Sequence, residues 1–247
     1  MCTIGAIKTK NGFQIFKQLD LPRKTEIFQP EIRRGKAGKY LAFSRENAKG
    51  VWAAANEHGL TFVAADANCE KQFPFSENDK KRLFQFYEKI TADFADLENA
   101  EKFIRERFEN DFRVPDIVAI GNGERFILLK FHPSQIWERD EVSSGALFCT
   151  NHFCHESNLH FNVAREKDES TFLRLETAQE LFAKGESLEA ILQNHDNGPG
   201  EKSICRHGKS GEFFTQACVI FKIEKQVSAK FTLNAKTCES DFAEIFL

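Results

Sequence analysis

The chain opens Met1-Cys2-Thr3-Ile4-Gly5-Ala6, and this stretch decides the fold and the chemistry that the rest of the sequence predicts. Cys2 begins a small, β-prone run that is typical of a strand start. If Met1 is removed, which the small side chain of Cys2 permits, Cys2 carries both a thiol and a free α-amine. A thiol needs a base to become a nucleophile, and an α-amine titrates near pH ~8. One residue could therefore supply nucleophile and base together, although a cysteine here could also be a small apolar residue.

Composition and charge exclude several classes of function. The chain has 247 residues and a net charge of −3, so no basic surface for nucleic acid is indicated. Its apolar runs stay well short of the ~18 residues that cross a bilayer, and no signal peptide is recognisable. Seven cysteines are an odd number, and their spacing fits no metal site, which indicates a reducing compartment. We therefore expect a cytoplasmic protein with no metal and with neither nucleic-acid nor membrane partners.

Hydrophobic patterning predicts many short strands and two helical blocks. Asn-Gly at 11–12 and Gly-Asn-Gly at 121–123 indicate tight hairpins, and helical periodicity covers 76–111, 170–184 and 187–194. The predicted strands are 2–8, 13–16, 51–56, 60–65, 117–120, 125–131, 146–150, 216–223 and 227–233. Residues 21–49 are basic and are expected to form an irregular surface excursion. The pattern predicts an α+β fold of antiparallel sheets with helices packed on them, in a single domain 1–247 that contains the helical block 76–111.

Polar side chains stand where predicted strands stop. Lys17 and Asp20 follow the first hairpin, Asn56 lies at a junction of strand and turn, Asn151 ends another strand, and Arg206 precedes the last hairpin. Strand ends are a common place for site residues because loops there carry function on a rigid scaffold.

Taken together, these positions resemble the cholylglycine-hydrolase-like branch of the N-terminal nucleophile hydrolases. That branch includes bile salt hydrolase, penicillin V acylase and the acyl-coenzyme A:6-aminopenicillanate acyltransferase-like proteins. The matching motifs, in family order, are Met1-Cys2-Thr3, Lys17-Gln18-Leu19-Asp20, Ala55-Asn56-Glu57-His58-Gly59-Leu60, Cys149-Thr150-Asn151 and Ser203-Ile204-Cys205-Arg206. The acyltransferase-like group is the most similar, because 203–207 and 215–220 resemble its C-terminal segment.

The resemblance implies a four-layer αββα sandwich of two antiparallel sheets flanked by helices, with Cys2 at the end of a central strand. It implies that Cys2 attacks an amide carbonyl while Asp20 holds its α-amine in place. Asn151 and Asn56 would line the oxyanion hole, where one donor is typically worth ~3 kcal/mol. Arg206 would steady the thiolate and the developing charge.

Lys17 departs from the family pattern, which usually has arginine at this position. Lysine keeps the positive charge but loses the planar five-donor fork of arginine. If that arginine normally bridges Cys2 and Asp20 with two bonds, Lys17 makes only part of the contact. Activity would then be weaker or differently tuned, unless the subgroup simply uses lysine.

Each of these residues also has a structural interpretation. Asp20 could be a turn residue, Asn56 could satisfy a turn backbone, Asn151 could cap a strand end, and Arg206 could form a surface ion pair. His152 and His155 have a spacing that could bind metal on a helix. No helix is indicated there, so a structural role is favoured for both histidines.

The ordered set of motifs predicts an amidohydrolase that cleaves a linear, non-peptide C–N bond through a thioester, or a closely related acyltransferase. Such an enzyme needs no metal or organic cofactor. Its partner is a small-molecule N-acyl amide substrate, and relatives suggest a homo-oligomer. Maturation is expected to be removal of Met1, and a chain that keeps Met1 is expected to be inactive. A glutamine-hydrolysing amidotransferase domain and a catalytically inactive binding protein of the same fold are the alternatives.

Overall fold

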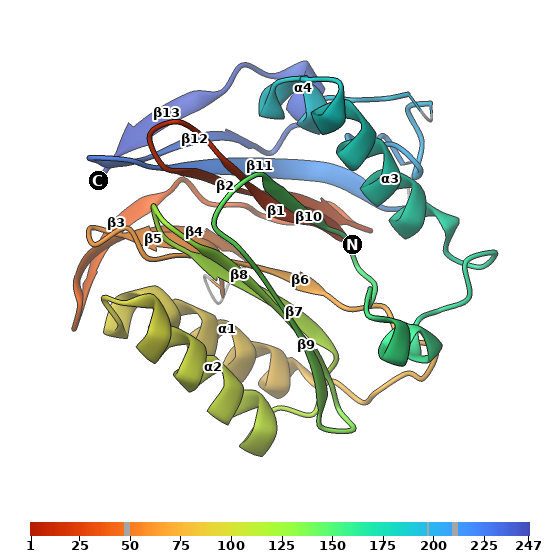
Figure 1. The fold of residues 1–247 in the computed structure, drawn as a ribbon, viewed down its shortest axis with the longest axis horizontal. Helices are drawn as coiled ribbons and strands as arrows, with labels where there is room; N and C mark the ends of the chain where they lie inside the picture. Colours follow the sequence, from red (N-terminus) through yellow and green to blue (C-terminus); the bar gives the residue numbers. More distant parts are fainter. Residues whose placement is uncertain (47–49, 197, 209–211) are drawn as a thin grey trace.

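The computed structural model describes residues 1–46, 50–196, 198–208 and 212–247. The upper sheet in Figure 1 is built around the chain's first hairpin. Its strands run in the order β10-β1-β2-β11-β12-β13, and every pair is antiparallel. These strands are β1 (Cys2–Lys8), β2 (Phe13–Leu21), β10 (Ala146–Cys149), β11 (Phe214–Ile223), β12 (Val227–Leu233) and β13 (Ala243–Phe246).

The lower sheet follows chain order, from β3 to β9, again with antiparallel neighbours only. Its strands are β3 (Glu31–Gly35), β4 (Gly38–Arg45), β5 (Gly50–Asn56), β6 (Thr61–Asp66), β7 (Asp116–Gly121), β8 (Phe126–His132) and β9 (Ile136–Val142). Residues 21–49 were expected to be irregular, and 47–49 lie outside the described residues. The prediction is wrong for β3 and β4, because the buried strand β4 pairs with β5, and β3 then pairs with β4 at the edge of the sheet.

Two helical layers cover the outer faces of the sheets. Helices α1 (Glu77–Asp93) and α2 (Leu97–Asn110) pack on the lower sheet, and α3 (Glu169–Ala183) and α4 (Leu188–Leu192) pack on the upper sheet (Figure 1). The 3-10 turns η1 (Glu156–Phe161) and η2 (Thr237–Glu239) complete the elements. The predicted block 76–111 is interrupted because Asp96 caps the start of α2.

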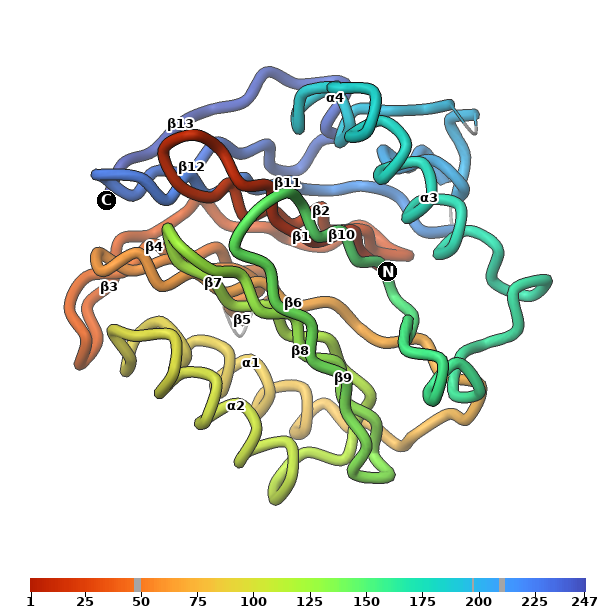
Figure 2. The backbone as a smooth tube through the Cα atoms, viewed as in Figure 1, coloured from red at the N-terminus to blue at the C-terminus, as the bar shows by residue number. Residues whose placement is uncertain are grey.

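Three apolar cores separate these four layers. One fills the space between the two sheets, a second lies between the lower sheet and α1 with α2, and the third lies between the upper sheet and α3 with α4. Figure 2 traces the same stacking along the backbone. The fold is therefore α+β, an αββα sandwich of two antiparallel sheets, as expected.

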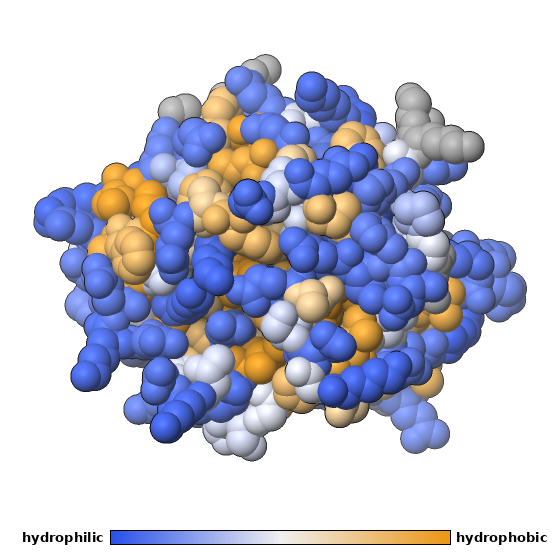
Figure 3. All heavy atoms as spheres, turned by 90° about the horizontal axis from the view of Figure 1, so that it is seen from above, coloured by the Kyte–Doolittle hydropathy of each residue, from blue (hydrophilic) through white to orange (hydrophobic). Residues whose placement is uncertain are grey.

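Polar side chains cover most of the face shown in Figure 3, with apolar groups between them. Among the described residues, no helix combines the length and the apolar character needed to cross a membrane.

Candidate active site

Cys2 is the first residue of β1 and is only 3% exposed. β1 lies between β2 and β10, so the segment that follows β10 passes beside the start of β1. The backbone nitrogen of Cys2 donates a hydrogen bond of 3.0 Å to Asn151 Oδ1. In this structure Met1 still precedes Cys2, and its ammonium donates to the backbone oxygen of Asp20 at 3.1 Å.

Strand alternation divides the predicted site residues between the two faces of the upper sheet. Successive side chains of a strand point to opposite faces. Cys2 and Leu19 are register partners and belong to the core between the sheets, and Lys17 lines a cavity with both of them. Asp20 points the other way, toward α3. Lys17 thus lies on the side of the Cys2 thiol, whereas the Asp20 carboxylate lies on the side of α3.

The Lys17 ammonium is buried between the sheets, where it donates to the backbone oxygen of Ala64 on β6. It also lies 5.5 Å from the ring centre of Trp52. Burial lowers the pKa of Lys17, and the Cys2 thiolate is the strongest of the charges that raise it again. The Lys17 side chain and the Cys2 sulfur therefore border the same cavity.

A cavity of about 320 Å³ opens beside these two groups. Its wall is largely apolar, and it includes Cys2, Lys17, Trp52, Ala64, Asp66 and Phe84. A second cavity of about 650 Å³ is lined by Met1 and shares Asp66, Phe75 and Leu83 with the first. The thiol therefore faces a small apolar space, and the residue that precedes it faces a larger one.

Asp20 is fully buried and carries one carboxylate oxygen without a hydrogen bond. Oδ1 accepts from Thr215 Oγ1 at 2.8 Å, while Oδ2 accepts none among the described residues and lies 3.9 Å from Nη1 of both Arg174 and Arg206. Burial raises the pKa of Asp20, and the guanidinium groups of Arg206 and Arg174 oppose that rise. A buried acceptor next to the N-terminus is suited to bind an amine.

Asn151 joins β10 to the start of β1. Its Oδ1 accepts from both the Cys2 nitrogen and Arg174 Nη2, the latter at 3.1 Å. Its Nδ2 donates to the backbone oxygen of Asp66 at 2.6 Å. The Asn151 side chain therefore contacts the Cys2 nitrogen through Oδ1, and its Nδ2 lies beside Asp66, which lines the cavity.

Arg206 contacts the carboxylate of Asp20 rather than the thiol. Its Nη2 donates to Ser170 Oγ at 3.3 Å, and its backbone nitrogen donates to Thr215 Oγ1 at 2.9 Å. Thr215 is the register partner of Asp20, so Arg206 belongs to the network on the α3 side of the sheet. The expectation that Arg206 steadies the thiolate directly does not fit this placement.

The structure does not bring Asn56 to the other predicted residues. Its Nδ2 donates to the backbone oxygens of Thr91 and Phe94, and its Oδ1 accepts from the backbone nitrogens of His58 and Leu60. It adjoins the Thr61 end of β6, whereas Cys2 adjoins the Asp66 end, roughly 16 Å along the strand. The assignment of Asn56 to the oxyanion hole is therefore wrong, and this residue instead ties a turn to the α1–α2 connection.

Comparison with known proteins places this geometry in a family. The profile of the acyl-coenzyme A:6-aminopenicillanic acid acyl-transferase family matches residues 25–236. The chain belongs to this family. The matched range begins after Cys2, Lys17 and Asp20. These three candidate site residues therefore rest on the sequence motifs and the structure, not on the family profile.

Solved structures share the fold of this acyl-transferase family member. A C2A mutant of conjugated bile acid hydrolase from Clostridium perfringens is 12% identical, with a TM-score of 0.58 over 100% of this chain and 92% of that chain. An N-acylethanolamine-hydrolyzing acid amidase ortholog from Caenorhabditis elegans is 10% identical, with a TM-score of 0.57 over 89% of this chain and 92% of that chain. The comparison with curated proteins found no match. These likenesses establish the N-terminal nucleophile hydrolase fold.

Arg174 is the site residue of this family member that sequence reasoning missed. It is fully buried on α3, and its Nη1 donates to the Cys2 carbonyl at 3.0 Å and to Thr3 Oγ1 at 2.8 Å. Burial lowers its pKa to about 10, so it stays charged at neutral pH. The available signal was its position in the buried stripe of α3 beside Thr171 and Ala178, where a charge needs a partner.

Asp66 and Asp116 were also missed. They are register partners on β6 and β7, and Tyr87 donates a hydrogen bond to Asp116. Burial raises the pKa of Asp116 well above its ordinary value, and Asp66 adds to that rise. The pairing of β6 with β7 crosses a helical block of the sequence, so no local pattern could reveal these opposed carboxylates.

Proposed function

We propose that this protein is an N-terminal cysteine amidohydrolase, or a closely related acyltransferase, that acts on N-acyl amides after Met1 is removed. The observation that carries this proposal is the hydrogen bond between the Cys2 nitrogen and Asn151. The same nitrogen becomes the α-amine of the mature chain. Its acceptor, Asn151 Oδ1, also accepts from Arg174, which lies 3.9 Å from Asp20 Oδ2.

In the first half of the reaction, groups on the two faces of the upper sheet have different roles. On the cavity side, the Cys2 sulfur attacks the acyl carbon of the substrate, and its proton passes to the α-amine. On the α3 side, Asp20 Oδ2 and Asn151 Oδ1 hold that amine. The Lys17 ammonium stabilises the thiolate before attack, because the two groups interact in a buried space.

Collapse of the tetrahedral intermediate breaks the C–N bond. The leaving amine takes its proton from the α-ammonium of Cys2, and a thioester remains on the sulfur. Water then attacks the thioester with the α-amine as base, which releases the acid and regenerates the thiol; in an acyltransferase a second amine replaces water. We propose Asn151 as an oxyanion donor, because its side chain contacts Cys2.

The two adjoining cavities suggest where the acyl and amine parts of a substrate bind. The apolar cavity of about 320 Å³ at the thiol suits an acyl group. The larger cavity of about 650 Å³, with Lys167 and Asp168 among its polar groups, suits the amine part once Met1 has left it. The names of the structural relatives, which hydrolyse conjugated bile acids and N-acylethanolamines, agree with an N-acyl amide as substrate.

A panel of N-acyl amides that release a fluorescent amine tests this function. Acyl groups of graded size are offered to protein whose loss of Met1 has been verified by intact mass. We expect turnover that depends on acyl size, that is abolished in Cys2→Ala and that is retained in Cys154→Ala, which removes an exposed cysteine. Turnover that survives in Cys2→Ala, or a mature protein that hydrolyses no member of the panel, would contradict the proposal.

A further inference from the structure

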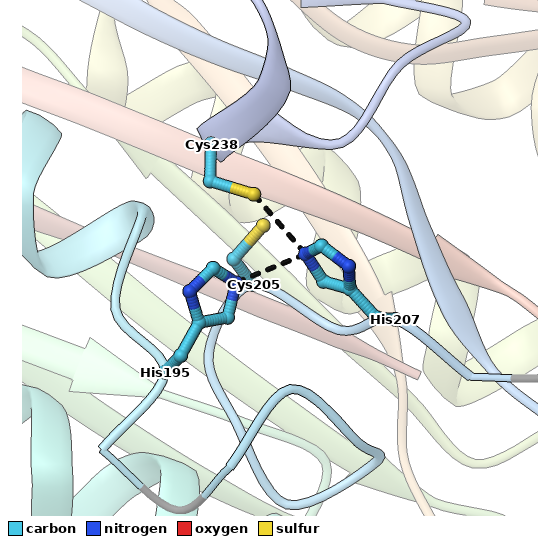
Figure 4. A group of neighbouring side chains, drawn as sticks. All are labelled: His195, Cys205, His207 and Cys238. Carbon is cyan, nitrogen blue, oxygen red and sulfur yellow. Dashed lines mark hydrogen bonds between the residues drawn. The ribbon is translucent and has the colours of Figure 1, made fainter.

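Four nitrogen and sulfur side chains converge at one place behind the candidate active site. His195, Cys205, His207 and Cys238 each offer one ligand atom, and all four atoms lie within 4.8 Å of one another. His207 Nε2 is 3.0 Å from His195 Nε2 and 3.1 Å from Cys238 Sγ. Figure 4 shows the four side chains pointing toward one another, and we call them the His₂Cys₂ cluster.

Three separate segments supply these ligands, which is why their spacing in the sequence indicated no metal site. His195 follows α4, Cys205 and His207 flank Arg206, and Cys238 lies in η2. Hydrogen bonds fix the segments to each other: the Cys205 nitrogen donates to the Asn194 carbonyl at 3.1 Å, and Gln193 Nε2 donates to the Thr237 carbonyl in η2 at 3.1 Å. The backbone positions of the four ligands are thus fixed by the fold.

The ligand set and its dimensions suit a tetrahedral, moderately soft cation. Zn²⁺ binds histidine nitrogen at about 2.0–2.1 Å and cysteine sulfur at about 2.3 Å, which places neighbouring ligand atoms of a tetrahedron about 3.3–3.8 Å apart. The closest contacts of the cluster, at 3.0 and 3.1 Å, are slightly shorter than this range, and no separation exceeds its upper end by more than about an ångström. Side-chain rotations of that size are enough to close four ligands around one ion.

The surroundings of the cluster also resemble those of a metal centre. His207 presents Nε2 to the cluster, and its other ring nitrogen, Nδ1, lies 3.7 Å from the Glu239 carboxylate. Histidines that ligate metals usually direct the second ring nitrogen to a carboxylate or carbonyl. Cys205 is fully buried, whereas the other three ligands are half-buried, so an ion could reach the cluster from solvent.

We propose that the His₂Cys₂ cluster binds one Zn²⁺ ion, or a similar divalent cation, as a structural site. On binding, the two thiols release their protons and become thiolates, so the pair balances the charge of the ion. The ion ties the segment after α4 and η2 to the segment that carries Arg206. Because Arg206 stands between two of the ligands, the ion also fixes the residue that faces Asp20.

Cobalt(II) substitution tests the proposal directly. Protein purified under a phosphine reductant is stripped with a chelator, passed through a desalting column and titrated with Co²⁺. We expect one equivalent to bind, with the visible absorption of tetrahedral cobalt and a thiolate-to-cobalt charge-transfer band in the near ultraviolet, and Zn²⁺ to displace it. Native mass spectrometry should show one Zn²⁺ on the full chain.

Variants separate this site from other thiols. Cys205→Ser with Cys238→Ser should lose the charge-transfer band, as should His195→Asn alone, while Cys2→Ala and Cys154→Ser should keep it. Circular dichroism verifies that each variant is folded, and the chelator should lower the Tm of the wild type but not that of the double variant. Reduced, folded wild type that binds no Co²⁺, or a band that persists in the double variant, would overturn the proposal. A Cys205–Cys238 disulfide in reductant-treated protein would also overturn it.

Discussion

The backbone nitrogen of Cys2 and the side-chain oxygen of Asn151 are joined by a 3.0 Å hydrogen bond, although 149 positions separate the two residues in the chain. This nitrogen is an amide while Met1 is present and an amine once Met1 is gone. The acceptor is held from the other side by Arg174. The site is therefore organised around the nitrogen before it can act as a base.

Replacement of Asn151 by alanine should reduce activity more than stability. The change removes the acceptor for the Cys2 nitrogen, and a hydrogen bond to a charged amine contributes about 1.5–3 kcal/mol, or roughly 10- to 100-fold in rate. We expect kcat to fall by that factor in steady-state assays on a substrate from the amide panel. A variant with unchanged kcat would show that Asn151 does not position the amine.

Replacement of Asn56 by alanine should have the opposite effect. Its buried amide makes four hydrogen bonds to the backbone, and their loss leaves buried groups unsatisfied. The free energy of unfolding should fall by about 3 kcal/mol in urea titrations, while kcat per folded molecule stays at the wild-type value. A large loss of kcat in folded protein would return Asn56 to the catalytic group and would contradict its placement here.

Lys17 can be tested by removing its charge with little change in size. Lys17→Met keeps an unbranched side chain beside the Cys2 thiol but loses the ammonium that stabilises the thiolate. We expect kcat/KM to fall by about 100-fold, comparable to the loss of one buried electrostatic contact in other active sites. Lys17→Arg, which keeps the charge, should retain more activity than Lys17→Met; equal activities for the two variants would exclude a role for charge.

His152 predicts how stability depends on pH. Burial lowers its pKa to about 3, and its Nδ1 is bound by Thr150 and Thr171 hydroxyls at 3.1 and 3.2 Å. Below about pH 6.5, the ordinary pKa of histidine, His152 binds a proton in the unfolded chain but stays neutral in the folded chain. This histidine therefore contributes stability at neutral pH that is lost as pH falls toward 3, by about 1.4 kcal/mol per unit.

The control for this prediction is His152→Gln, which cannot titrate. Between about pH 6.5 and pH 5 the wild type should lose about 2 kcal/mol more unfolding free energy than the variant, measured by urea titration at each pH. His132, whose pKa burial also lowers, contributes equally to both proteins and cancels. Parallel pH profiles for the two proteins would contradict the burial of a neutral His152.

Local patterns predicted the parts of the fold in which hydrophobic period and turn chemistry agree. The hairpin of β1 and β2 around Asn11-Gly12 and the helices α3 and α4 are where they were expected. Strands β3, β9 and β13 were missed because they are edge strands with exposed, polar faces. The buried strand β4 was missed because it lies in the basic stretch 21–49. Only pairing with a neighbour makes such segments strands.

The site was predictable for Asn151, which follows the apolar strand β10, and for Asp20, although β2 extends past the predicted end at residue 16 and includes Asp20. For Arg174 the helical pattern could indicate burial, but not the contact with Cys2, which arises only because α3 packs on the upper sheet. Asn56 was predicted to be a site residue but is not one. It carries a family-like motif, but its side chain satisfies a turn at the far end of β6 from Cys2.

Acylation of Cys2 with and without Met1 tests whether the free α-amine of Cys2 is the catalytic base. One form is released from a cleavable leader so that Cys2 is the first residue, and the other is made with methionine removal inhibited. Both are mixed with an N-acyl amide, quenched in acid, and analysed by intact mass and peptide mapping. We expect a thioester on Cys2 in the first form only. Equal acylation of both forms, or an adduct confined to another residue, would contradict it.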